Sequence, residues 1–410
     1  MLKNRYLRII FLMWLAWAII VIGFQKLVEM RMQPDRPDYA TDWTSNETNR
    51  NSQSDKIYLT EPFMNRQVSW DSEFYLSIAT YGYDDPNIRL VTVRDENGQR
   101  DLSMNYAFFP LYPMVMGAVA APLKLLGMEP IAASSLAGVF VALLGTLAGL
   151  IALYDLVRDE LGDEGGLRAG FYLLIFPTGF FLAQVYTEGL FIGFAFGTLA
   201  LLKRRMLIPA AVLAMLATWT RSVGALLIIP LALVWLNDVW VEYRAGKIQP
   251  LTLAKGLLVL APLAAYLIWR VALGEQFELV ETTWFGRNLL DFEGSFNGWK
   301  GILSAWGELN PQRQIYMLLE ISAVLLALVA CLFTLRRYPG VALFGLAVLF
   351  IALTSGYPQS LIRYVLVIPS ITIFLSRLGR NIAFDRAWTV ASLLLMGLLV
   401  TLFTYDMWVA

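Results

Sequence analysis

The sequence contains no histidine, a single cysteine and few charged residues, and each shortage excludes a class of chemistry. Without histidine the chain has no Ser-His-Asp triad, no HExxH zinc site and no imidazole proton relay. The one cysteine, Cys331, lies in an apolar run, so an intramolecular disulfide is impossible and a thiol nucleophile is not expected. Any acid–base chemistry must therefore come from carboxylates, tyrosine, lysine or arginine.

The scarcity of charge also defines the class of protein. Charged residues make up 16% of the 410 residues, against roughly a quarter in a soluble protein. Hydrophobic residues make up 58%, and the mean hydropathy is +0.58. The formal net charge is zero, so there is no basic surface for nucleic acid, and Walker A, GxGxxG and EF-hand patterns are absent. The composition predicts an all-α polytopic membrane protein, and a nucleotide-consuming enzyme or ATP-driven pump is not expected.

Apolar runs of about 20 residues predict the membrane-spanning helices. The first run, 9–24, follows Lys3, Arg5 and Arg8 and lacks a small-residue cleavage site. We therefore expect a retained signal anchor with a cytoplasmic N-terminus. Ten further spans are predicted at 131–155, 168–185, 187–202, 206–221, 222–240, 252–273, 314–335, 340–355, 361–377 and 386–406. Two polar intervals, 30–106 and 274–313, interrupt the apolar series.

The segment 107–127 is apolar enough to cross the membrane, and the positive-inside rule tests whether it does. The basic clusters Lys203–Arg205, Arg336–Arg337 and Arg377/Arg380 should share the side of the N-terminus. They do so only if 107–127 lies at the outer interface without crossing. The prediction is a single multi-pass domain over 1–410 with about eleven spans, an extracytoplasmic loop over 30–130 that contains interfacial helices, and a second such loop over 274–313.

The larger polar interval contains the stretch W-D-S-E-F-Y-L-S-I-A-T-Y-G-Y at 70–83, which places two carboxylates among aromatic residues. Trp70, Phe74 and Ile78 recur at helical spacing, so Asp71 and Glu73 lie at the start of a helix. Acids in that position commonly cap backbone amides, and capping explains the spacing at least as well as catalysis. A carboxylate that faces a partly dry cavity can also act as a general base.

Three charged residues stand at the predicted outer boundary of apolar runs: Glu188, Arg221 and Arg363. An acid buried in the membrane costs free energy and marks a functional site, whereas a Glu188 exposed at the interface would have no such meaning. Guanidinium groups suit the oxygens of an anionic phosphate ligand. The arginines could equally snorkel to lipid headgroups or pair with Glu188, and the sequence alone favours neither interpretation.

The stretch 70–83, followed by A-F-F-P-L-Y-P at 107–113, resembles the PIG-V family of polyprenyl-phosphate-mannose-dependent mannosyltransferases, and in particular its prokaryotic-type members. Three later patterns resemble the same family: Y-T-E-G-L-F at 186–191, T-R-S-V-G at 220–224, and R-Y at 363–364 before Pro369. One departure is that Asn105 and Tyr106 precede A-F-F-P, where eukaryotic members often have Glu and His. This departure leaves the acceptor open and does not concern Asp71.

The resemblance implies a GT-C type of fold and the inverting transfer of mannose, or another hexose, from a polyprenyl-phosphate sugar to a hydroxyl group of a lipid or glycan. It implies Asp71 as the catalytic base and positive charge from Arg221 and Arg363 for the leaving phosphate. The substrate-binding residues expected from it are Trp70, Glu73, Tyr75, Tyr83, Tyr186, Glu188, Arg221, Arg363 and Tyr364. The scheme needs no cofactor and no metal, and a divalent metal stays an open alternative.

Two other functions compete with this one. A transporter or flippase for a lipid-linked or anionic substrate would explain the arginines but not the large loop with its carboxylate motif. A scaffold that retains the fold without activity is the second alternative. For the enzyme, we expect an integral membrane protein with an extracytoplasmic active site, in the cell membrane if the host is a prokaryote.

Overall fold

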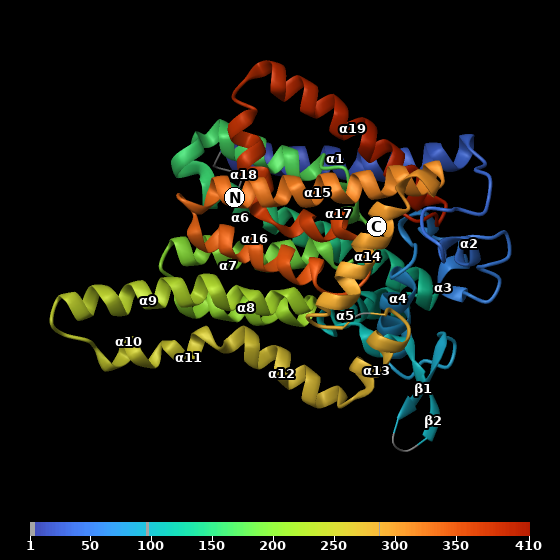
Figure 1. Ribbon diagram of the computed structural model, residues 1–410, viewed down its shortest axis with the longest axis horizontal. Coiled ribbons are helices and arrows are strands. Elements are labelled where there is room, and N and C mark those ends of the chain that lie inside the picture. Colours follow the sequence, from blue (N-terminus) through green and yellow to red (C-terminus); the bar gives the residue numbers. More distant parts are fainter. Residues whose placement is uncertain (1–4, 96–97, 287) are drawn as a thin grey trace.

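The computed structural model describes residues 5–95, 98–286 and 288–410, and it is almost entirely helical (Figure 1). Long helices lie side by side in a bundle, and shorter elements gather at one end of it. A two-stranded antiparallel hairpin, β1 (Leu90–Asp95) and β2 (Gly98–Ser103), projects from that end. The expected helical membrane class is confirmed, with this hairpin as an addition that the sequence analysis did not predict.

Among the described residues, five helices are long and apolar enough to cross a membrane, or up to seven if each of two bent pairs is one span. The five are α1 (Arg5–Arg31), α6 (Pro130–Leu174), η4 with α9 (Ser222–Leu227 and Ile228–Arg244), α15 (Pro311–Leu335) and α19 (Ile382–Thr404). One bent pair joins α10 (Pro250–Ala254) and α11 (Gly256–Val259) to α12 (Ala261–Leu273), and the other joins α17 (Leu361–Tyr364) and η6 (Val365–Val367) to α18 (Pro369–Leu378).

Three shorter helices occupy other predicted spans: α7 (Glu188–Lys203), α8 (Leu207–Thr220) and α16 (Pro339–Leu353). They contain 16, 14 and 15 residues. At a rise of 1.5 Å per residue they are about 21–24 Å long, which is less than the roughly 30 Å of a bilayer core. The count of about eleven spans therefore stays a prediction.

The structure corrects the predicted span at 168–185. α6 continues to Leu174 after a break at Gly162, and the following segment, 175–187, contains only the short 3-10 helix η3 (Gly179–Ala183). Pro177 has no amide hydrogen for a helical ladder, and a Cβ on Gly179 would lie 2.5 Å from the carbonyl oxygen of Leu174. The whole segment is buried, so its apolar composition reflects packing inside the bundle.

The basic clusters meet at one end of the bundle, called here the basic end. Residues of these clusters pair with acids of α6: Arg204 with Asp155, Arg337 with Glu160, and Arg377 with Glu160. Tyr6, near the start of α1, stacks on Tyr154 beside them with 6.1 Å between ring centres. The described start of the chain and the three clusters thus share a side, as the positive-inside argument required. Whether that side is cytoplasmic stays a prediction.

The two polar intervals meet at the opposite end, called here the loop end (Figure 1). The first contains α2 (Thr44–Glu47), α3 (Ile57–Thr60), η1 (Asn65–Gln67), α4 (Ser72–Tyr81), β1, β2 and η2 (Met104–Ala107), followed by α5 (Leu111–Leu125). The second contains α13 (Gln276–Thr283), α14 (Phe292–Ser304) and η5 (Trp306–Glu308). Ion pairs between Arg100 and Glu275 and between Arg313 and Asp42 join the two intervals, so both lie on one side.

The segment 107–127 contains α5, and its expected non-crossing arrangement stays a prediction. Tyr112, in its first turn, donates a hydrogen bond to the carbonyl of Gly138 at 3.0 Å. Ala120, further along α5, packs against Ala133, which is nearer the start of α6. The two helices thus run antiparallel over the first part of α6 only. Because α5 has 15 residues, about 22 Å in length, it is also short for a full crossing.

Candidate active site

Asp71 lies at the loop end, in the N-cap position of α4. Within the described part of the chain its carboxylate accepts no capping hydrogen bond from the first turn, so the geometry does not support the capping interpretation. Instead, Oδ2 lies 2.9 Å from Nη1 of Arg363, which comes 292 residues later. The Asp71 side chain keeps 24% of its exposure, whereas that of Arg363 keeps 7%. The carboxylate is therefore paired but still accessible.

The turn that carries Asp71 is fixed by hydrogen bonds on both sides. Trp70 has φ of +51°, a left-handed conformation that is uncommon for a bulky residue and needs support from its surroundings. The Tyr186 hydroxyl accepts from the Asp71 amide at 3.2 Å and donates to the Ser69 carbonyl at 3.1 Å. Asp406, which follows α19, accepts from the Trp70 amide at 3.2 Å. These contacts set the direction in which Asp71 points.

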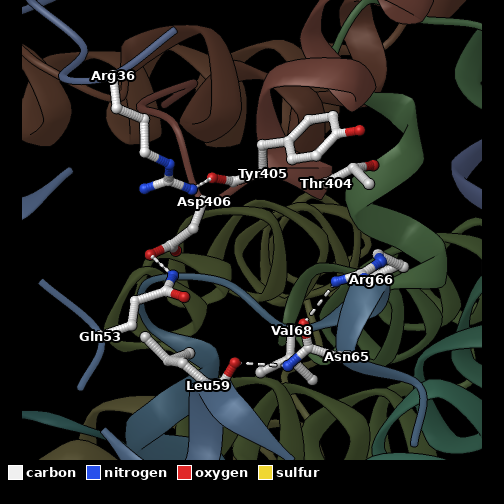
Figure 2. Close-up of a pocket in the computed structure, with 9 residues that line it drawn as sticks. All are labelled: Arg36, Gln53, Leu59, Asn65, Arg66, Val68, Thr404, Tyr405 and Asp406. Carbon is white, nitrogen blue, oxygen red and sulfur yellow. Dashed lines mark hydrogen bonds between the residues drawn. The ribbon is translucent and has the colours of Figure 1, made fainter. Parts of the chain in front are cut away.

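A small polar cavity of about 70 Å³ has Asp406 in its lining (Figure 2). It is lined by Arg36, Gln53, Leu59, Asn65, Arg66, Val68, Thr404, Tyr405 and Asp406. Asp406 accepts a hydrogen bond from Gln53, and Arg36 donates to the carbonyl of Tyr405. Burial raises the pKa of the Asp406 carboxyl. Asp406 thus joins the lining of the cavity to the Trp70 amide.

Arg363 belongs to α17, and aromatic rings surround its guanidinium group. The Cζ atom lies 5.6 Å from the ring centre of Phe181, 5.2 Å from that of Tyr186 and 5.5 Å from that of Tyr364. Such ring faces stabilise a cation that has lost most of its water. Its Nε has no hydrogen-bond partner among the described residues and lies 3.7 Å from Oε1 of Glu188. Arg363 thus has one buried N–H that no described residue accepts.

Glu188 begins α7 and is fully buried beside two arginines. Its Oε1 accepts a hydrogen bond from Arg221, in addition to the longer contact with Arg363. The next residue, Gly189, allows α7 to approach α6 closely, since a Cβ there would lie 2.2 Å from the carbonyl oxygen of Ala142. The close packing of these two helices therefore places Glu188 at the site.

The four charged residues form one chain in which carboxylates and guanidinium groups alternate: Asp71, Arg363, Glu188 and Arg221. The ring of Tyr364 lies beside both guanidinium groups, 5.5 Å from one Cζ and 5.7 Å from the other. The formal charge of the four is zero, so an anion that binds the arginines has to compete with their carboxylate partners. A carboxylate displaced in this way becomes available as a base.

Most of the residues singled out in the sequence meet here: Asp71, Tyr75, Tyr186, Glu188, Arg221, Arg363 and Tyr364. Tyr75 is buried, with its ring 6.2 Å from that of Tyr186. Pairing of the arginines with Glu188, one of the alternatives left open above, is observed. Arg363 is buried and so does not snorkel, whereas for Arg221 this alternative stays open.

Three of the expected substrate-binding residues make supporting contacts instead. Glu73 is buried and pairs with Arg89 at 3.2 Å, away from the chain of four charges. The indole of Trp70 packs edge-on against Trp408 with 5.0 Å between ring centres. The hydroxyl of Tyr83 donates to the backbone carbonyl at position 108 at 2.8 Å. A direct role of these side chains toward substrate stays a prediction.

The site also contains residues that the sequence analysis did not select. Thr187 accepts a hydrogen bond from Arg221 at 2.9 Å. Glu320, in α15, accepts from the amide of Ile362, directly before Arg363, at 2.7 Å. A signal for Glu320 exists in the sequence, because it is the only acid in the apolar run 314–335. The role of Asp406 follows from tertiary packing and has no comparable local signal.

The fold and the site define a helical membrane enzyme with an accessible carboxylate and two arginines at one end of its bundle. The family model described as Mannosyltransferase (PIG-V) matches residues 10–244, more than half of the chain. The chain belongs to this family and is a glycosyltransferase. The recognition made from the motifs is confirmed, whereas the GT-C type of fold and the number of spans stay predictions. Asp71, Glu188 and Arg221 lie within the matched range, whereas Arg363 lies beyond it.

Two solved structures show a distant likeness to the chain. The crystal structure of ArnT from Cupriavidus metallidurans, bound to undecaprenyl phosphate, is 13% identical with a TM-score of 0.44, over 86% of this chain and 74% of that one. The archaeal oligosaccharyltransferase AglB from Archaeoglobus fulgidus, in complex with an inhibitory peptide and a dolichol-phosphate, is 13% identical with a TM-score of 0.42, over 96% and 55%. The chain thus spans about half the length of AglB. No curated protein matches the sequence.

Proposed function

We propose that the enzyme transfers a mannosyl, or another hexosyl, residue from a polyprenyl-phosphate sugar to a hydroxyl group of a lipid or glycan acceptor on the outer face of the membrane. Membership of the mannosyltransferase family supports the class of reaction. The observation that carries the proposal is the accessible Asp71 carboxylate, 2.9 Å from a buried arginine at the loop end. The basic end lies opposite, which favours the outer position for the site.

In the proposed mechanism the donor phosphate first replaces Asp71 as the partner of Arg363. Guanidinium groups bind phosphate oxygens through paired hydrogen bonds, and Arg221 stands beside the same Tyr364 ring to bind the second side of the phosphate. The exchange releases the Asp71 carboxylate next to the anomeric carbon. Donor binding thereby prepares the base, and this predicts that the donor binds before the acceptor reacts.

The transfer itself is a single displacement with inversion at the anomeric carbon. Asp71 accepts the proton of the acceptor hydroxyl while the acceptor oxygen forms its bond to that carbon. The bond between the carbon and the phosphate oxygen breaks, and the polyprenyl phosphate leaves with the electron pair. Arg363 and Arg221 stabilise the negative charge that develops on the leaving phosphate, in a site where little water screens them.

The proposed mechanism needs no cofactor or metal, because the two arginines supply the positive charge at the leaving group. Membranes washed with EDTA should therefore keep their transfer rate. A loss of activity after EDTA treatment that Mg²⁺ or Mn²⁺ restores would contradict this part of the proposal.

The substitution Asp71→Asn tests the base directly. In membranes supplied with labelled polyprenyl-phosphate mannose, we expect the variant to lose transfer by a factor of about 10² to 10⁴, the usual contribution of a positioned base. Asp84→Asn provides the matched control, because Asp84 is exposed and hydrogen-bonds to Tyr106 outside the site. Wild-type transfer by Asp71→Asn would refute the assignment. Movement of the lipid across vesicles without a glycosidic bond, unaffected by the substitution, would favour a flippase instead.

The exchange at Arg363 makes a second prediction for the Asp71→Asn variant. The asparagine side chain carries no charge and competes less well for the guanidinium group, so polyprenyl phosphate should bind more tightly although transfer is lost. We expect a gain of about tenfold in affinity, equivalent to ~1.4 kcal/mol, in a binding titration with purified protein in detergent. Equal or weaker binding would show that donor phosphate and Asp71 do not compete for Arg363.

A further inference from the structure

Glu320 is a fully buried acid inside the membrane-spanning helix α15. An acid in such a place lowers the stability of the inserted helix, and such residues mark functional sites. Its Oε2 accepts a hydrogen bond from the amide of Ile362 at 2.7 Å. Because Ile362 is the residue directly before Arg363, this bond acts on the backbone that carries the arginine of the site.

The same short turn, 360–363, is held at two further backbone atoms. The buried Thr178, from the irregular segment after α6, donates its hydroxyl to the carbonyl of Ile362 at 3.0 Å. Tyr316, one helical turn before Glu320, accepts from the amide of Ser360 at 2.9 Å. Ser360 has φ of +65°, a left-handed conformation that a serine seldom adopts without support. Side chains from two other elements therefore set the path of this turn.

We propose that Glu320 is a positioning residue for the transfer reaction, acting through the backbone of Ile362 to hold Arg363 against Asp71 and the donor phosphate. The inference rests on the proposed function, since the role of Arg363 is defined there. If the amide of Ile362 lost its acceptor, the turn would move until this amide met another one, because buried backbone amides rarely stay unpaired. A shift of about 1 Å in a group that binds the leaving phosphate is enough to slow a reaction strongly.

The test compares three variants of α15. Glu320→Leu has similar size and removes the acceptor, whereas Glu320→Gln keeps an oxygen that can accept from Ile362. We expect the leucine variant to lose transfer by about tenfold or more and to bind polyprenyl phosphate more weakly, and the glutamine variant to recover most of both. Thr334→Val is the control, since the Thr334 hydroxyl is buried in the same helix and has no hydrogen-bond partner among the described residues. It should behave as the wild type.

A double-mutant cycle shows whether Glu320 acts through Arg363. If it does, adding Glu320→Leu to Arg363→Ala should weaken the binding of polyprenyl phosphate no further. An equal loss in both backgrounds would contradict the proposal, and so would wild-type behaviour of the leucine variant. Thr178→Val removes the other side-chain bond to Ile362 and should give the same pattern, so it replaces Glu320→Leu if that variant is not monodisperse on size-exclusion chromatography.

The outcome of Asp71→Asn separates this inference from the function on which it rests. An inactive Asp71→Asn together with a fully active Glu320→Leu would refute the role of Glu320 and leave the proposed function standing. A fully active Asp71→Asn would refute the proposed base, whatever the behaviour of Glu320. Loss of activity in both, with rescue by glutamine at position 320, supports both.

Discussion

Both ends of the helix bundle contain pairs of carboxylates and guanidinium groups, but the two sets differ in burial. At the basic end, the side chains of Arg205 and Asp238 keep 56% and 41% of their exposure. At the active site, those of Arg363 and Glu188 keep 7% and 0%. Exposed pairs contribute about 0–1 kcal/mol to folding and are screened by salt. Buried pairs carry a desolvation penalty that their mutual attraction often fails to offset.

The comparison indicates that the two sets have different roles. The pairs at the basic end bring together positive residues from separate helices, and their common side is what the positive-inside rule detects. At the active site, the cost of burying the charges offsets much of the attraction between them, so these pairs stabilise the fold little. Their burial agrees with the proposed exchange of partners when a phosphate binds. Breaking single pairs in each region should therefore have unequal effects on the reaction.

The largest effect is expected at Arg363. Arg363→Ala leaves Asp71 and Glu188 without their shared partner and removes a donor to the leaving phosphate, so transfer should fall by a factor of about 10² to 10³. Arg363→Lys keeps the charge but not the planar fork, and we expect it to fall between the alanine variant and the wild type. The measurement is the initial rate of transfer at equal amounts of monodisperse protein. A rate within threefold of wild type for the alanine variant would contradict the site.

The residues of this site could be recognised in the sequence one by one, but their proximity in the folded protein could not. Asp71 and Arg363 lie 292 residues apart, and each belongs to its own motif. Nothing in the local pattern predicts that one pairs with the other, because the distance depends on how α4 and α17 pack at the loop end. The resemblance to the family selected the residues, and the bundle brought them together.

The fold shows the same division between local and tertiary information. The long apolar runs predicted α15 and α19 to within a few residues, whereas α1 (Arg5–Arg31) extends well beyond the predicted run 9–24. The predicted span at 168–185 was wrong in its second half, because a buried irregular segment has the same apolar composition as a lipid-facing helix. Glu73 looked equivalent to Asp71 in the sequence, yet its pairing with Arg89 depends on a contact across the loop end.

Glu73 allows a sharper comparison, since it is buried and paired but lies outside the chain of four charges. Burial raises the pKa of its carboxyl above the usual value of about 4.5, although Arg89 acts in the opposite direction. Between pH 4.5 and this raised pKa, the native protein binds a proton that the unfolded chain has released. This contribution to stability is complete below pH 4.5 and is lost as the pH rises through the raised pKa of the folded protein.

Glu73→Gln imitates the protonated acid at every pH and should remove that dependence. We expect its melting temperature to exceed that of the wild type by about 1–3 °C at pH 7.5, with the difference disappearing near pH 4.5. Thermal unfolding of the purified protein, followed at both pH values, provides the measurement. A lower melting temperature than wild type at pH 7.5 would mean that Arg89 stabilises the charged form more than burial disfavours it.

The smallest effect is expected at the basic end, where Asp238→Asn makes the same chemical change as Asp71→Asn. Both substitutions remove one carboxylate from an arginine within 3 Å, since the two contacts measure 2.7 and 2.9 Å. The pairs differ in burial and in position, so the contrast isolates those two factors. We expect Asp238→Asn to change the free energy of unfolding by less than ~0.5 kcal/mol and to transfer sugar at the wild-type rate. If it slowed transfer as much as Asp71→Asn, loss of a carboxylate anywhere in the bundle would suffice, and pairing with the buried Arg363 would no longer explain the role of Asp71.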